Sequence, residues 1–203
     1  DDQSESKKYD NVLDQWLMAK LAVLIRDVSA SMEAYDLPRS VRPIQEFIDE
    51  FSTWWLRRSR DRFKGEDEKD KKQAIAAFRH AILELSKVMA PFTPFIAEQA
   101  YKRAGGKMDS VHLDKWPETG KIDEKVIEQM DQVRKIVELG LAKRAEAGMK
   151  IRQPLSNMTV AGYELDDEYD RIICEEMNIK NVEFKKAGEI SISLDTELTE
   201  ELK

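Results

Sequence analysis

The spacing of apolar residues predicts amphipathic helices over most of the chain. Leucine, valine and methionine recur at steps of three and four through residues 10–35, so one face of this segment is apolar. Pro38 should end this helix, because proline disfavours helical conformation at the residue before it. A second helix should hold Pro43 in its first turn, where the missing N–H is not needed. The apolar stripe of this second helix is Ile44, Phe47, Ile48, Phe51 and Trp55.

Three further helices follow from the same pattern. One should run from about residue 68 to Met89, where two nearby prolines interrupt it. A short helix should cover about 94–104 and stop at a pair of glycines. A long helix should cover about 122–147 and stop near Gly148. Its predicted inward residues are Val126, Met130, Val133, Val137 and Leu141.

The pattern changes after Pro154. "LSNMTVAGY" alternates as a strand does, "DDEYDRIICEEMN" is typical of a helix, and "IKNVEFKKAGEISISLD" reads as two strands about a Lys-Ala-Gly turn, hence a hairpin. We therefore predict a mainly α protein. An antiparallel helical bundle should occupy residues 1–154, and a small α+β unit of βαββ order should occupy residues 155–203.

Composition and charge favour a soluble, helix-rich protein. Charged residues make up 36% of the 203 positions, and the formal net charge is −7, which argues against non-specific binding to nucleic acid. The acids are concentrated, however, because residues 164–203 hold 13 acids and 5 bases. No apolar run is long enough for a bilayer, and the polar start lacks the apolar core of a signal peptide. We expect a cytoplasmic protein, a piece of a larger chain, with no membrane association.

One segment stands out against the acidic background. "FSTWWLRRSRDRFKG", residues 51–65, carries five basic residues and one acid beside two tryptophans. Arginine binds phosphate through a bidentate fork, and an indole ring can stack on an unstacked base, so the composition suits a single-stranded RNA loop. The structural alternative stays open: Trp55 would fill the core, and Arg58 and Arg62 would pair with carboxylates such as Glu98.

A second basic run lies where the long helix ends. "LAKRAEAGMKIRQPLS" contains four cations, Lys143, Arg144, Lys150 and Arg152, against Glu146. Cations at a helix C-terminus are common, because they interact favourably with the helix dipole. Two such runs on an otherwise nearly neutral bundle are more informative than either run alone.

The sequence predicts no catalytic or metal site. His80 and His112 have no cysteine near them in sequence, and a structural role is expected for both, as for the single cysteine, Cys174. The chain has no CxxC, HExxH, EF-hand, GxxxxGK[ST] or GxGxxG motif.

Four stretches in order carry a resemblance to a known family. "FIDEFSTWWLRRSRDRF", "LSKVMAPFTPFIAEQAY", "SVHLDKWPE" and "LGLAKRAEAGMKIRQPLS" resemble the C-terminal anticodon-binding region of class I aminoacyl-tRNA synthetases of the Ile/Leu/Val group. The last stretch and the remaining C-terminal residues are most similar to the isoleucine member. The leucine and valine members stay open as alternatives, and so does a protein-interaction helical bundle with no RNA-binding role.

The resemblance implies that the chain holds the anticodon stem–loop of a tRNA of the isoleucine type. The parent would be a monomeric ligase that attaches isoleucine to tRNA. It would use ATP and Mg²⁺ in a catalytic domain that is absent here, as is the editing domain. The HIGH and KMSKS motifs of that catalytic domain are missing, so this chain should be non-catalytic and hold no cofactor. The predicted tRNA-binding residues are Trp55, Arg57, Arg58, Arg60, Arg62, Lys143, Arg144, Lys150, Arg152 and Gln153.

Overall fold

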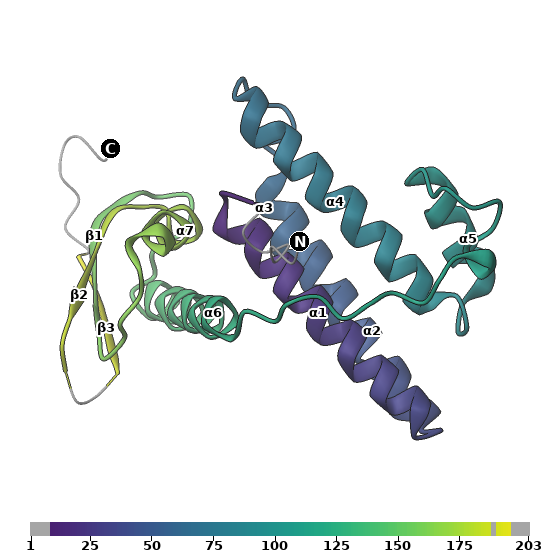
Figure 1. Cartoon of the computed structure of the whole chain (residues 1–203). Coiled ribbons are helices and arrows are strands. Elements are labelled where there is room, and N and C mark those ends of the chain that lie inside the picture. The colour runs from purple at the N-terminus through teal and green to yellow at the C-terminus, as the bar shows by residue number, and fades with distance from the viewer. Residues whose placement is uncertain (1–8, 188–189, 196–203) are drawn as a thin grey trace. The chain divides into compact units, whose positions relative to one another are not determined.

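The computed structural model describes residues 9–187 and 190–195, and these form helices followed by a small sheet (Figure 1). They fall into two compact units that divide between Val126 and Ile127. The predicted domain boundary lies later, between residues 154 and 155. The two boundaries differ in where they assign the helix Glu124–Glu146, most of which belongs to the second unit. Within the described residues, none of the helices combines the length and apolar character of a bilayer-spanning segment.

The N-terminal unit begins with two long helices, α1 (Val12–Glu33) and α2 (Leu37–Glu50). Asn11 caps α1 by accepting a hydrogen bond from the N–H of Leu13, and Asp36 caps α2 by accepting one from the N–H of Arg39. The predicted break between the first two helices is confirmed, because α1 ends at Glu33 and α2 begins at Leu37. The predicted place of Pro43 in the first turn of the second helix is wrong. Pro38 lies in the first turn of α2, where its ring suits the helix start, and Pro43 lies inside the helix.

The helix that begins at Leu37 continues past α2 without a break. A π-helical segment, η2 (Phe51–Leu56), leads directly into α3 (Arg57–Ser59), and the junction residues Glu50 and Leu56 keep right-handed helical backbone angles. A π-helical turn holds more residues than an α-helical turn, so it shifts the faces of all later residues. This segment contains the two adjacent tryptophans.

Two further helices complete this unit as predicted, α4 (Glu68–Met89) and α5 (Pro94–Arg103), followed by a short 3-10 turn, η3 (Val111–Leu113). The glycines after α5 are required. Gly105 has a φ of 77°, and a Cβ on Gly106 would lie 2.1 Å from the ring of Tyr101. That ring packs in a small apolar cluster with Ala90, Ala97 and Val111.

Glu98 joins α5 to the turn that follows it. Its carboxylate pairs with Lys102 at 2.8 Å and accepts hydrogen bonds from the Val111 N–H at 2.8 Å and the Ser110 hydroxyl at 2.9 Å. The hydrogen-bonded ion pair with Lys102, followed by the hydrogen bond from Val111, lowers the pKa of Glu98 from 4.5 to about 2. The folded state therefore favours the ionised form of this side chain.

This lowered pKa predicts a loss of stability in acid. A carboxyl whose pKa falls on folding stabilises the protein above its unfolded pKa, and that contribution disappears as pH falls through the folded pKa. We expect the stability difference between the wild type and Glu98→Gln to narrow between about pH 5 and about pH 2.5, measured by urea unfolding. A difference that stays constant over this range would contradict the assignment.

The C-terminal unit holds the rest of α6 (Glu124–Glu146), whose first turn precedes the division between the units. Val126, Met130, Val133 and Val137 are buried as predicted, but Leu141 is 39% exposed, so that part of the prediction is wrong. Gly140 is buried in its place. A Cβ there would lie 2.7 Å from the end of the Met177 side chain, which shows how closely α6 approaches the elements after it.

Three strands and a helix follow, β1 (Leu155–Ala161), α7 (Asp170–Met177), β2 (Ile179–Lys185) and β3 (Ser191–Leu194), with a 3-10 turn, η4 (Asp167–Tyr169), before α7. The βαββ order is confirmed, but the predicted hairpin between the last two strands is wrong. The sheet order is β2-β1-β3, with β1 parallel to β2 and antiparallel to β3. The most apolar strand, β1, therefore takes the centre. Part of the predicted turn, Gly188, lies outside the described residues.

Candidate nucleic-acid interface

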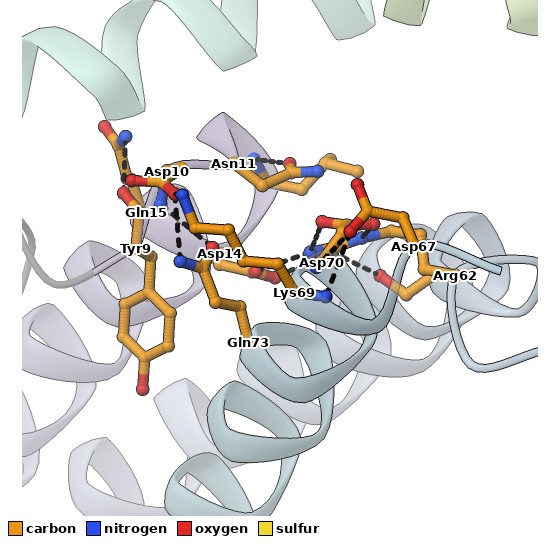
Figure 2. A network of polar contacts seen from close by, with 12 residues as sticks. Tyr9, Asp10, Asn11, Asp14, Gln15, Arg62, Asp67, Lys69, Asp70 and Gln73 are labelled. Atoms are coloured by element: carbon orange, nitrogen blue, oxygen red, sulfur yellow. Dashed lines mark hydrogen bonds and ion pairs between the residues drawn. The ribbon is translucent and has the colours of Figure 1, made fainter. Parts of the chain in front are cut away.

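Arg62 is a half-buried residue, just after α3, that connects its own segment to α1 and α4. Its guanidinium lies between two carboxylates, Asp14 of α1 and Asp70 of α4 (Figure 2). It donates to the two Asp14 oxygens at 2.9 and 2.7 Å and to the two Asp70 oxygens at 2.8 and 2.7 Å. Burial lowers the pKa of Arg62, but the hydrogen bonds and charges of the two aspartates outweigh it and raise this pKa. With its side chain only 11% exposed, Arg62 serves the packing of the helices.

Trp55 belongs to the same buried cluster. Its indole N–H donates to an Asp14 carboxylate oxygen at 3.0 Å, and both residues are fully buried. The ring stacks on Phe51 and Phe78 at centroid distances of 5.5 and 6.2 Å and meets the edge of Phe63 at 6.1 Å. The structure therefore supports the alternative in which Trp55 fills the core.

The same end of the unit carries a polar network nearer to the surface. Lys69 pairs with Asp10 at 2.6 Å, and the Gln73 side-chain amide donates to the same carboxylate at 3.0 Å (Figure 2). The Gln73 side-chain oxygen accepts the Asp10 N–H at 3.2 Å. These contacts tie the start of α1 to the first turns of α4, the two helices that supply the aspartates around Arg62.

Trp54 also offers no ring face to a base. It is buried, and the guanidinium carbons of Arg57 and Arg58 lie 5.8 and 5.7 Å from its ring centroid. The cation–π arrangement holds these two arginines against the helix. Base stacking on either tryptophan is therefore not available in this structure.

Arg57, Arg58 and Arg60 form a cationic surface that we call the arginine ridge. Arg57 and Arg60 are exposed, and Arg58 is half-buried. Arg57 donates from Nε to the Thr53 carbonyl at 2.9 Å, which fixes the base of its side chain. Arg60 makes no ion pair with any residue in the described part of the chain. Arg57 and Arg60 are therefore the exposed cations of the ridge, and a guanidinium can bind phosphate through paired N–H donors.

The second basic run divides between surface and interior. Lys143 is exposed and pairs with Glu146 at 2.8 Å. Arg144 is only 1% exposed, and its guanidinium donates to three backbone carbonyls, at Met177, Lys150 and Gln153. Lys150 and Arg152 are exposed and form no ion pair with any described residue, while Gln153 is half-buried.

These positions correct part of the predicted site. Trp55 and Arg144 are buried, and the guanidinium of Arg62, whose side chain is 11% exposed, is engaged by two carboxylates, so we reassign these three to contacts within the protein. The alternative that Arg62 pairs with carboxylates of the bundle is confirmed by Asp14 and Asp70. Glu98 is the wrong example, because its carboxylate bonds to Lys102 and to Val111. The other seven residues have side chains at least partly at the surface, and their role in binding stays a prediction. They are Arg57, Arg58, Arg60, Lys143, Lys150, Arg152 and Gln153.

Sequence reasoning missed the acids that hold Arg62. Asp14 lies between Leu13 and Leu17 on the apolar face of the first predicted helix, and an acid in an apolar stripe indicates a buried polar partner.

Cys174 is half-buried, and burial raises the pKa of its thiol. Across the described residues, no group of three or more His, Cys, Asp or Glu side chains is arranged to hold a metal ion.

Comparison with known proteins identifies the relatives of this chain. Residues 14–159 match the family model described as the anticodon-binding domain of tRNA ligase. An isoleucine–tRNA ligase of Deinococcus radiodurans is 41% identical over 179 residues, which cover 85% of this chain and 17% of that protein. The corresponding ligase of Clostridium tetani is 39% identical over 186 residues, covering 86% and 18%.

A third bacterium gives the same result. An isoleucine–tRNA ligase of Chlamydia trachomatis is 36% identical over 195 residues, covering 89% of this chain and 19% of that protein. The chain thus spans less than a fifth of the length of the curated relatives that it matches.

Proposed function

The chain belongs to the family of anticodon-binding domains of tRNA ligases, and from this premise we propose that it binds the anticodon stem–loop of a tRNA. The observation that carries the proposal is the arginine ridge, whose exposed guanidinium groups suit phosphate oxygens. Phosphate contacts set the register of an RNA on the protein, and contacts to base edges supply specificity.

The tRNA in this proposal is of the isoleucine type. The relatives at 36–41% identity are isoleucine–tRNA ligases, which favours the isoleucine member over the leucine and valine members. The parent would be a ligase that joins isoleucine to its tRNA, with ATP and Mg²⁺ bound in a separate catalytic domain. Holding the anticodon arm here would place the acceptor end of the tRNA at that distant site, and this chain would take no part in the chemistry.

The arginine ridge gives the first test of this function. Replacing Arg60 with alanine should weaken binding of an isoleucine tRNA transcript several-fold. Because a phosphate contact releases counterions, the slope of log affinity against log salt should shrink by about 0.7–0.9 for each phosphate that is no longer neutralised. Filter binding at several salt concentrations measures both quantities. The melting temperature should hardly change, because Arg60 makes no ion pair with a described residue.

Arg39→Ala is the matched control. Arg39 is an exposed arginine at the opposite end of the same continuous helix, in the first turn of α2. Its removal should leave tRNA affinity and the salt slope unchanged. If the wild-type chain bound no isoacceptor at low salt, or if Arg57→Ala and Arg60→Ala left binding unchanged, the rival function of a protein-interaction bundle would be favoured.

A further inference from the structure

In the loop of residues 149–153, between α6 and β1, three backbone carbonyls accept hydrogen bonds from side chains outside the loop. Arg144 donates to the Lys150 carbonyl at 2.7 Å and to the Gln153 carbonyl. The Asn178 side-chain amide donates to the carbonyl of Ile151 at 2.9 Å. The loop also closes on the helix, because the Met149 N–H donates to the Arg144 carbonyl at 2.9 Å. We call residues 149–153 the basic loop.

Arg144 is an unusual buried cation because backbone carbonyls, and no described carboxylate, accept its hydrogen bonds. It also donates to the Met177 carbonyl at 3.1 Å, so one planar guanidinium joins the end of α6, the basic loop and the end of α7. Burial lowers its pKa, but an arginine side chain keeps its charge in a folded protein. A buried charge is costly unless it is hydrogen-bonded, so the fold favours the loop conformation that supplies these carbonyls.

Asn178 is the second anchor, and its backbone explains why asparagine is present. It ends α7 with φ 48° and ψ 55°, a left-handed conformation that asparagine tolerates better than most residues. In this position its side chain reaches the Ile151 carbonyl, while its own carbonyl accepts the Leu155 N–H at 3.1 Å. The same residue therefore fixes both the loop and the start of the central strand.

The occupied carbonyls affect which groups of the loop are free to meet a ligand. Carbonyl oxygens carry partial negative charge and repel phosphate, and here three of them already accept hydrogen bonds from Arg144 and Asn178. The side chains of Lys150, Ile151 and Arg152 are exposed, and the two cations form no ion pair with a described residue. A polyanion would meet two unpaired positive charges with no competing backbone acceptor from Lys150 or Ile151.

We propose that the basic loop is a second phosphate-contact element for RNA, with Arg144 and Asn178 as its positioning residues. The inference rests on the proposed binding of tRNA. Lys150 and Arg152 touch the RNA backbone, and Arg144 and Asn178 act only through them. An RNA is favoured over an acidic peptide because residues 14–159, which include the basic loop, match the anticodon-binding domain of tRNA ligase.

Asn178→Gly is the most selective test. Glycine keeps the left-handed backbone without strain and deletes only the amide that holds Ile151. Removal of one anchoring hydrogen bond should weaken binding of the isoleucine tRNA transcript by about twofold to tenfold. Lys150→Ala/Arg152→Ala should weaken binding further and reduce the salt slope by about 0.7–0.9 for each phosphate that is no longer neutralised. Lys185→Ala, which removes an exposed cation of β2, is the matched control and should change neither quantity.

A double-mutant cycle separates positioning from general stability. If Asn178 acts through the two cations, Asn178→Gly should have almost no further effect on affinity once Lys150 and Arg152 are alanine. An equal decrease in both backgrounds would overturn the positioning role. Arg144→Lys gives a second variant, because lysine keeps the charge but lacks the planar fork that reaches several carbonyls. It should show the same dependence on the two cations.

Two outcomes distinguish this inference from the proposed function. If Arg60→Ala weakens tRNA binding while Lys150→Ala/Arg152→Ala leaves affinity and slope unchanged, the basic loop is not a contact element and the proposed function stands. If the wild-type chain binds an acidic peptide and no tRNA at low salt, both proposals fail.

Discussion

Replacing Trp55 with alanine should lower the free energy of unfolding by about 3–5 kcal/mol, the range for removing a large aromatic side chain from a packed core. The ring is fully buried and stacks on Phe51 and Phe78, so its removal leaves a cavity that its neighbours fill only in part. The change also removes the indole N–H from the buried Asp14 carboxylate. Urea unfolding followed by circular dichroism measures the decrease.

Trp55→Phe is the control for the hydrogen bond. Phenylalanine keeps an aromatic ring in the stack but removes the donor to Asp14, so we expect a smaller decrease of about 1–3 kcal/mol. The affinity of either variant for tRNA should match the wild type under conditions where the variant is folded. If Trp55→Ala changed stability only slightly and weakened tRNA binding, Trp55 would belong to the RNA interface.

Arg62→Met should have an effect of similar size for a different reason. Methionine fills much of the space but removes the guanidinium that pairs with Asp14, a fully buried carboxylate. Breaking a buried ion pair by removing one partner costs about 3–5 kcal/mol, because the remaining charge stays desolvated. The measurement is again urea unfolding, with the midpoint and slope analysed separately.

Asp70→Asn and Arg60→Met provide the comparison. Asp70 is the more exposed of the two carboxylates, and asparagine keeps one oxygen for Arg62, so this change should cost no more than about 1 kcal/mol. Arg60→Met alters an exposed arginine only two residues from Arg62 and should leave stability nearly unchanged. If Arg62→Met were as mild as Arg60→Met, the buried bridge would not stabilise the fold.

The helices were predictable from sequence because their apolar periodicity is local. Caps and glycine stops lie within a few residues of the ends that they define, as at Gly105 and Gly148. Strand pairing is a different kind of information. The alternation in residues 179–194 predicts two strands correctly, but only the tertiary fold shows that β1 lies between them. A turn-like sequence between two strands therefore does not establish a hairpin.

The candidate site was only partly predictable, because an arginine on a helix has the same sequence signal whether it is buried or exposed. Arg62 is held by Asp14, which is 48 positions away, and Arg144 is held by carbonyls, which have no sequence signature. The exposed Arg57 and Arg60 and the half-buried, doubly paired Arg62 occur in one short run. Only the packed structure, which determines burial and hydrogen-bond partners, separates surface arginines from arginines that hold the fold together.

The π-helical segment between Glu50 and Arg57 sets the direction in which the side chains after it point. A π-turn acts as an insertion of about one residue into a helix, which turns everything after it by about 100°. Beyond the turn, Ser59 is fully buried and Arg58 is half-buried. The side from which the arginines project is thus encoded by the length of this turn as well as by the arginines. The loss or gain of one residue in this turn would change the direction in which the arginines point, even if every cationic residue were retained.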